Sequence, residues 1–150
     1  MEGWAIRRDL VLVALLEGPK TLSELSRVTG LSRSELEATL LSLKVAGLVL
    51  EQEARGLIRR KTVYSLTEQG RKEAKEARSR IERIAQEVTQ KVEQGDDEGL
   101  EELLTAYALF LPLLMHLHLL DVALLQQLGD INDWAPEGEE SGDELEDTWI

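Results

Sequence analysis

Two helix-start signals on either side of a glycine turn constrain the fold of this 150-residue chain more than any other feature. In Thr21-Leu22-Ser23-Glu24, and again in Ser32-Arg33-Ser34-Glu35, a hydroxyl residue is followed three positions later by a glutamate. Such a capping box satisfies two backbone N–H groups at the start of a helix. The first box predicts a short helix that stops at Gly30, and the second predicts a helix to about Ala46 that ends at Gly47. Two capped helices joined by such a turn predict a helix-turn-helix.

The segments around this motif extend the prediction in both directions. Residues 4–17 carry apolar side chains at helical spacing and stop at Gly18-Pro19, which predicts a preceding helix. Two strand-like segments follow the motif, at 48–53 and 58–66, and the glycine-containing turn 54–57 between them predicts a hairpin. We therefore expect a mainly α fold with a small β-hairpin wing.

A long polar helix is expected over residues 68–93, with Thr67 as its cap. Its apolar residues are spaced 3-4-3-4, which makes about two heptads of a coiled-coil seam. This spacing predicts that the helix pairs along one stripe, formed by Ala74, Ala77, Ile81, Ile84 and Val88.

The second half of the chain contains a strongly apolar region. Residues 103–120 form an 18-residue run without formal charge, long enough for a membrane span. Pro112 interrupts the run and two histidines lie inside it, so we favour an apolar helical hairpin or one kinked helix over 100–128, buried at a dimer interface. His118 and Asp121 would share a helix face, which we interpret as a histidine held by a carboxylate rather than a metal site. The predicted dimerisation residues are Ala77, Ile81, Ile84, Val88, Leu103, Leu109, Leu113, Leu117 and Leu120.

The charge is divided unevenly along the chain. The formal net charge is −12, from 17 Lys and Arg against 29 Asp and Glu, which taken alone argues against nucleic acid as a partner. Every basic residue, however, lies at or before Lys91, so residues 1–91 carry +4 and residues 92–150 carry −16. This asymmetry predicts a mildly basic module joined to an acidic appendage, with an acidic tail over 129–150.

Several classes of protein are excluded by composition and motifs. The chain has no cysteine, which excludes a disulfide scaffold, a cysteine-ligated zinc or iron–sulfur site and a thiol nucleophile. It has no glycine-rich phosphate loop, nucleophile elbow or paired His/Glu metal motif. We expect neither an enzyme nor a bound metal or cofactor. No targeting peptide is visible, so we expect a cytoplasmic protein.

The order of the predicted elements resembles a winged-helix DNA-binding domain of the MarR/ArsR-like microbial transcription regulators. The resemblance covers about residues 1–93 and divides the chain into a winged helix-turn-helix (1–67), a long linker or dimerisation helix (68–93), the apolar region and the tail. It is carried by Leu15-Leu16-Glu17-Gly18-Pro19, Thr21 to Ser26, Thr29 to Ser34, Leu40 and Leu43, Ala46 to Val49, and Tyr64 to Gly70.

The resemblance implies a homodimer that binds duplex DNA, with residues 32–46 as the recognition helix and 54–61 as the wing. Hydroxyl and basic side chains can contact phosphates or base edges, and Ala38 or Leu41 could touch a thymine methyl. The predicted DNA-binding residues are Thr21, Ser32, Arg33, Ser34, Ala38, Leu41, Arg55, Arg59, Arg60 and Lys61.

Other interpretations stay open at this point. The outward face of the predicted recognition helix is apolar, and Glu35 and Glu37 offset the charge of Arg33 and Lys44, which also suits a protein-contact module without DNA binding. A membrane-anchored winged-helix protein is the third alternative. We also hypothesise that the acidic tail competes with DNA for the basic wing. The sequence names no effector and no operator.

Overall fold

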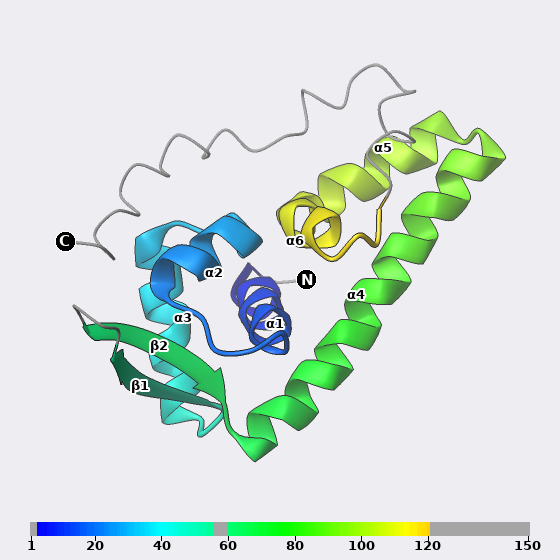
Figure 1. Ribbon diagram of the computed structural model, residues 1–150. Coiled ribbons are helices and arrows are strands. Elements are labelled where there is room, and N and C mark those ends of the chain that lie inside the picture. The colour runs from blue at the N-terminus through cyan, green and yellow to red at the C-terminus, as the bar shows by residue number, and fades with distance from the viewer. Residues whose placement is uncertain (1–2, 56–59, 121–150) are drawn as a thin grey trace.

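The computed structural model describes residues 3–55 and 60–120 (Figure 1). The long helix α4 runs along one side of the molecule, and the chain then returns from its far end toward α2. In chain order the elements are α1 (Gly3–Leu15), α2 (Leu22–Thr29), α3 (Arg33–Val45), β1 (Val49–Arg55), β2 (Arg60–Leu66), α4 (Glu68–Gln94), α5 (Asp97–Ala106), the 3-10 helix η1 (Ala108–Phe110) and α6 (Leu111–His116).

Both predicted capping boxes are present. The Thr21 hydroxyl accepts a hydrogen bond from the Glu24 backbone N–H at 3.2 Å, and the Glu24 carboxylate accepts one from the Thr21 N–H at 2.8 Å. Ser32 and Glu35 repeat this pattern at the start of α3. Gly30 ends α2 in the left-handed conformation, with φ of 77°. The predicted helix-turn-helix is therefore confirmed.

The hairpin is antiparallel, and its register pairs Val49 with Leu66 and Arg55 with Arg60. Helix α4 follows the hairpin and is held against its base by the Thr67 side chain and by a close backbone approach at Gly70. Thr67 caps α4 by accepting a hydrogen bond from the Gly70 N–H, and its hydroxyl also donates to the Gly47 carbonyl at 2.7 Å. Gly70 has no Cβ, and a Cβ there would lie 1.9 Å from the Leu48 carbonyl oxygen. The close approach of α4 to the base of the hairpin therefore requires glycine at this position.

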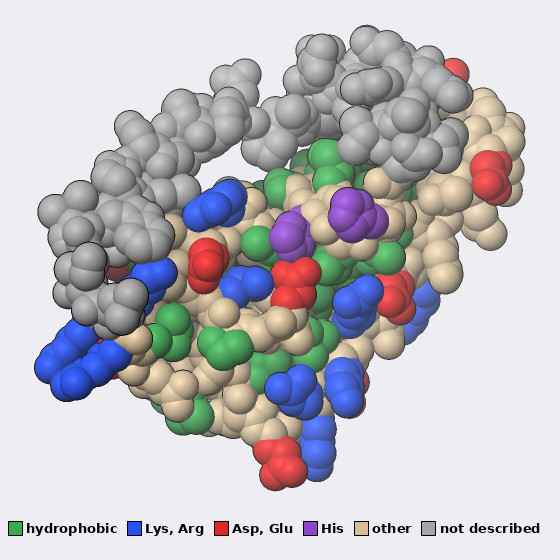
Figure 2. Space-filling view, in the orientation of Figure 1, with side chains coloured by type: hydrophobic (Ala, Val, Ile, Leu, Met, Phe, Trp, Pro, Cys, Tyr) green, Lys and Arg blue, Asp and Glu red, His purple; other side chains and the backbone are tan. Residues whose placement is uncertain are grey.

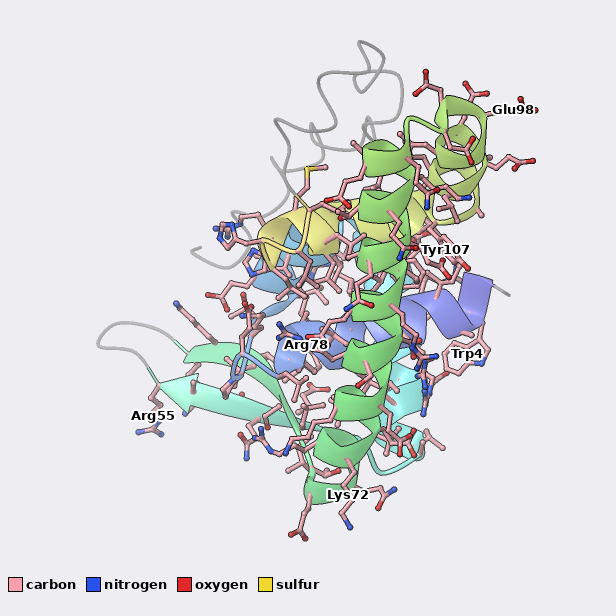
Figure 3. All side chains as sticks on the ribbon, turned by 90° about the vertical axis from the view of Figure 1, so that its right-hand side faces the viewer. Trp4, Arg55, Lys72, Arg78, Glu98 and Tyr107 are labelled. Atoms are coloured by element: carbon pink, nitrogen blue, oxygen red, sulfur yellow. The ribbon has the colours of Figure 1, made fainter. Side chains whose placement is uncertain are left out.

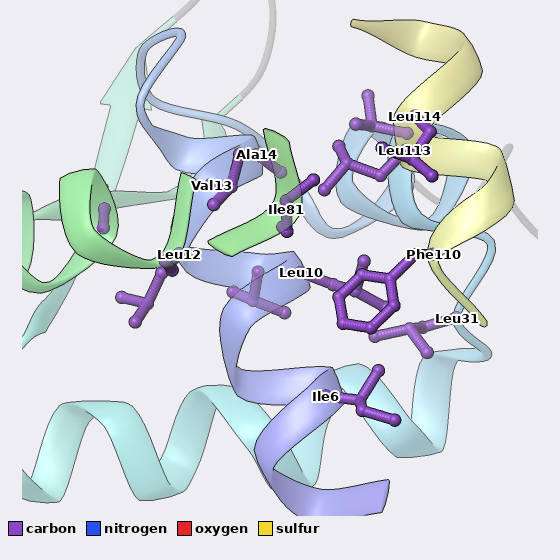
Figure 4. Packing of buried hydrophobic residues seen from close by; sticks show 14 of the residues in the cluster. Ile6, Leu10, Leu12, Val13, Ala14, Leu31, Ile81, Phe110, Leu113 and Leu114 are labelled. Carbon is purple, nitrogen blue, oxygen red and sulfur yellow. The ribbon is translucent and has the colours of Figure 1, made fainter. Parts of the chain in front are cut away.

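The hydrophobic core is built around α1. Residues Leu10 to Ala14 of this helix are all fully buried, because α2, α3, α4 and η1 surround it. A fully buried leucine contributes about 1.5–3 kcal/mol relative to an exposed one. Figure 4 shows Phe110 of η1 beside Ile6, Leu10 and Leu31 in this core.

The apolar stripe of α4 is buried inside the same chain. Its residues are at most 7% exposed, and α4 makes its most extensive helix–helix packing with α1 and α5. The stripe thus has partners without a second copy of the protein.

The apolar region after α4 differs from the sequence prediction in two details. Helix α5 begins at Asp97, three residues before the predicted start of the apolar region, and the Asp96 carboxylate accepts a hydrogen bond from the Gly99 N–H at 2.9 Å. The uncharged run 103–120 is divided among α5, η1 and α6. Pro112 lies in the first turn of α6, where its missing N–H costs no helical hydrogen bond. Residues 121–128 of the predicted hairpin lie outside the described residues, and within the described ranges no helix is long and apolar enough to cross a membrane.

The predicted contact of His118 with Asp121 lies partly outside the described residues, and the structure shows another histidine–carboxylate contact. His118 lies beyond the end of α6 with φ of 60°, so it shares no helix face with a later residue, and Asp121 lies outside the described residues. His116 of α6 instead lies 3.0 Å from the Glu17 carboxylate, which follows α1. The sequence did not predict this His116 contact, because a contact between positions 99 residues apart has no signature in local spacing.

Candidate nucleic-acid interface

Helix α3 has two apolar faces with opposite environments. Leu36, Leu40 and Leu43 face the core and are at most 2% exposed. On the opposite face, Ser34, Ala38, Leu41 and Val45 are all exposed; we call these four residues the outer strip. Leu41 is 60% exposed and Val45 is 82% exposed. The outer strip therefore offers apolar surface that the chain itself does not cover in the part that the structure describes.

Charged residues flank the outer strip in ion pairs. The Arg33 guanidinium lies 3.4 Å from the Glu37 carboxylate one turn later on α3. The Lys44 ammonium lies 2.6 Å from the Glu51 carboxylate of β1, and this hydrogen bond raises the pKa of Lys44. These pairs lower the positive charge that the face presents.

A groove separates α3 from the hairpin and brings three predicted cations together. Arg33 approaches it from α3, and Arg60 and Lys61 approach it from β2. Burial raises the pKa of Tyr64, which lies in the same groove, so its phenol stays protonated and can donate a hydrogen bond at neutral pH. The complete lining is Thr21, Leu22, Arg33, Glu37, Glu51, Arg60, Lys61, Thr62 and Tyr64.

The hairpin carries basic side chains away from the helical body. Figure 3 shows Arg55 projecting from the end of β1, and the space-filling view shows Lys and Arg side chains gathered at this end of the molecule (Figure 2). Arg60 lies 3.5 Å from the Glu53 carboxylate across the hairpin. The predicted site residue Arg59 lies outside the described residues.

The remaining predicted DNA-binding residues, Thr21 and Ser32, are helix caps. The Thr21 side chain is used in the cap of α2, and the residue is 7% exposed. Ser32 is exposed, and its hydroxyl accepts the Glu35 N–H. Thr21 therefore contributes to the groove lining, whereas Ser32 lies at the exposed start of α3.

The predicted dimerisation residues are mostly buried within one chain. Leu109 is 45% exposed, and Leu103 and Leu117 are half-buried. The fully or nearly fully buried ones are Ala77, Ile81, Ile84, Val88, Leu113 and Leu120. Homodimerisation therefore stays a prediction. Of the predicted dimerisation residues, Leu103, Leu109 and Leu117 have surface that a second copy could contact.

Trp4 is a surface residue that the sequence prediction missed. It is 45% exposed and lines a second groove together with Ser34, Ala38 and Ser42 of α3. Helical spacing gave no signal for it, because Trp4 shares a helix face with Val11, which is fully buried. Trp4 is exposed because it lies in the first turn of α1, and an exposed aromatic side chain is a candidate contact residue.

Two polar contacts fix the helices around this interface. Asp9 is 3% exposed, and its carboxylate accepts two hydrogen bonds from Arg80 of α4, at 3.0 and 3.2 Å. At the other end of α1, burial raises the pKa of the Glu17 carboxyl, but hydrogen bonds from His116 and Lys20 outweigh it and hold this pKa below 4.5. These contacts join α1 to α4 and α6. The described residues contain no group of three metal-ligating side chains.

Known proteins share this architecture. The model of the HxlR-like helix-turn-helix family matches residues 3–94. The apo structure of a double mutant of Lactococcus lactis ZitR shares the fold, with a TM-score of 0.54 and 19% identity over 69% of this chain and 80% of that one. The reduced form of the transcriptional regulator YodB from B. subtilis is 24% identical over 58% of this chain and 78% of that one, with a TM-score of 0.40. No curated protein matches the chain.

Proposed function

This chain belongs to the HxlR-like helix-turn-helix family, and we propose that it is a cytoplasmic, homodimeric transcription regulator that binds duplex DNA. The MarR/ArsR-like regulators that the sequence resembles are a related family. The observation that carries the proposal is the placement of the outward face of α3 beside a basic hairpin, with one groove between them. Helix α3 lies in the major groove, and the hairpin contacts the adjacent phosphates.

The cations of the hairpin supply most of the affinity in this arrangement. Arg55, Arg60 and Lys61 lie on its two strands, and Arg33 lies across the groove. Each phosphate neutralised by such a side chain releases counterions, which makes binding depend strongly on salt and little on sequence. The ion pairs to Glu37 and Glu53 oppose this attraction, so non-specific binding is modest.

The dimer places two copies of α3 on one face of the duplex. The recognition helices of such dimers lie about 34 Å apart, one helical turn of DNA. Leu103, Leu109 and Leu117 are the predicted dimerisation residues with surface left for a partner. Light scattering should give about twice the 16.8 kDa mass of the chain, and a mass of 16.8 kDa would contradict the dimer.

DNA binding is tested by reversing the hairpin charges. The triple variant Arg55→Glu, Arg60→Glu, Lys61→Glu should weaken binding to a random duplex at low salt by at least about 100-fold, because it replaces three attractive phosphate interactions with repulsion. Its plot of log affinity against log salt should be shallower by about 0.9 for each phosphate that the variant no longer neutralises. Fluorescence anisotropy measures both quantities.

A matched control has the same charge change on another surface. Lys72, Lys75 and Arg83 are exposed along α4, and their replacement by glutamate should reduce affinity far less. Equal reductions in the two triple variants would show that net charge, and not the hairpin, governs binding.

A protein-contact module is the second candidate function. The exposed Leu41 and Val45 favour it, because apolar side chains on a surface helix suit a protein interface. The native chain would then shift no duplex DNA at micromolar concentration in low salt.

A further inference from the structure

The outer strip of α3 has a composition that is unusual for reading base pairs. Direct readout commonly uses Arg or Lys for guanine and Asn or Gln for adenine. The outer strip contains none of these, because it consists of Ser34, Ala38, Leu41 and Val45. Two of its apolar members are strongly exposed, at 60% for Leu41 and 82% for Val45.

The basic residues of α3 are held to the sides of this strip. Arg33 is paired with Glu37, and Lys44 is drawn toward β1 by its 2.6 Å contact with Glu51. Both cations are therefore engaged by carboxylates on the flanks. This leaves apolar side chains, with one hydroxyl, along the line that faces outward.

The major groove contains one apolar group that such a strip can contact. Thymine alone among the unmodified bases presents a methyl group there, and apolar side chains contact it. From Ala38 to Val45 the helix rises about 10 Å, which corresponds to about three base-pair steps. The three apolar residues can thus meet methyl groups within a stretch of about four base pairs.

We infer that α3 recognises thymine methyl groups, with Ala38, Leu41 and Val45 as the specificity-determining residues, so that the protein selects A·T-rich duplexes. The inference rests on the proposed function, since it requires α3 to lie in the major groove. Ion pairing of Arg33 with Glu37 and of Lys44 with Glu51 increases this preference, because the two cations are then less available to bind guanine.

Matched duplexes test this inference with the full-length protein. An alternating A·T duplex is compared with the same duplex carrying uracil in place of thymine, and a G·C duplex is compared with its 5-methylcytosine form. Burial of one methyl changes affinity about fourfold, so two or three methyls should favour thymine over uracil by roughly 15- to 60-fold. The 5-methylcytosine duplex should bind more tightly than unmodified G·C, since its methyl occupies the same edge of the groove.

Variants separate the strip from the rest of the interface. Leu41→Ala with Val45→Ala should lower the thymine-to-uracil ratio to about fourfold or less, because only Ala38 then keeps its contact with a thymine methyl. Leu50→Ala is the control, because Leu50 is 48% exposed but lies on β1, and it should keep the native ratio. Thermal unfolding of each variant verifies that the fold is retained.

The outcomes distinguish this inference from the proposed function. Equal, salt-dependent affinity of the native protein for the thymine and uracil duplexes would overturn methyl recognition and leave DNA binding standing. Binding to none of the four duplexes at low salt would overturn DNA binding itself and assign the outer strip to a protein partner.

Discussion

Helix α4 and the outer face of helix α3 each carry an apolar stripe, and the two stripes lie in different environments. The stripe of α4, formed by Ala74, Ala77, Ile81, Ile84 and Val88, is at most 7% exposed. The outer strip of α3 is exposed along its whole length. The spacing of apolar residues therefore reveals that a helix has a partner surface, but not whether the partner is in the same chain.

The difference arises from what each helix has available to pack against. Helix α1 is apolar on nearly all sides, so it offers a face to α4 in addition to those it offers to α2 and α3. Helix α3 already buries Leu36, Leu40 and Leu43 on its inner side, and no described element covers the opposite side. The α4 stripe is part of the hydrophobic core, whereas the outer strip stays exposed and is the surface that we propose for recognition.

The largest expected effect comes from the centre of the α4 stripe. Ile81→Ala should lower the free energy of unfolding by about 2–5 kcal/mol, because it leaves a cavity at a fully buried position. Urea denaturation measures the change, and the exposed Arg83→Ala on the same helix is the control. If Ile81→Ala instead left unfolding unchanged but shifted a monomer–dimer equilibrium, the stripe would belong to a subunit interface and the comparison would fail.

A smaller effect is expected from the ion pair that holds α4 against α1. Asp9→Asn should cost about 1–3 kcal/mol, because it removes the charge from a carboxylate that is only 5% exposed and accepts two hydrogen bonds from Arg80. Glu73→Gln, which removes the more exposed bond to Arg8, should cost less than about 1 kcal/mol. Equal destabilisation of the two variants in urea denaturation would contradict the expectation that the buried Asp9 carboxylate contributes more to stability than the more exposed Glu73 carboxylate.

Local chemistry could be predicted from the sequence, and it explains much of the fold. The caps of α2, α3 and α4 depend on residues three positions apart, so Thr21, Ser32 and Thr67 were identified without a structure. The two faces of α3 follow from helical periodicity in the same way. The hairpin was located by its glycine-containing turn, although the tip over 56–59 lies outside the described residues.

Contacts between distant segments could not be predicted from the sequence. The pairing of Lys44 with Glu51, which reduces the charge beside the outer strip, depends on the angle between α3 and β1. The contact of His116 with Glu17 depends on the return of the chain from α4. Periodicity located the α4 stripe correctly, but its partner follows from three-dimensional packing.

A pH-dependent effect is expected where α6 is attached to the helix-turn-helix. Glu17 has a folded-state pKa below its ordinary value of 4.5, so its contribution to stability is present above that value and is lost as the pH falls through the folded-state pKa. Glu17→Gln should therefore destabilise the protein at pH 6 by less than about 1 kcal/mol, the range for solvent-screened pairs. The difference from the native protein should shrink toward pH 3. The exposed Glu101→Gln on α5 is the control, and an offset that stays constant from pH 3 to 6 would exclude the Glu17 charge as its source.

The smallest effect on stability is expected from the outer strip, where Leu41→Ala should change the free energy of unfolding by no more than about 0.5 kcal/mol. Leu41 is 60% exposed, so its truncation opens no cavity, and alanine also favours the helical conformation. Urea denaturation of Leu41→Ala beside Ile81→Ala compares a leucine and an isoleucine that both lie on apolar helix stripes. A destabilisation above about 1.5 kcal/mol for Leu41→Ala would mean that part of the chain covers the outer strip. A negligible change would mean that the Leu41 side chain does not contribute to the stability of the fold and is available to a binding partner.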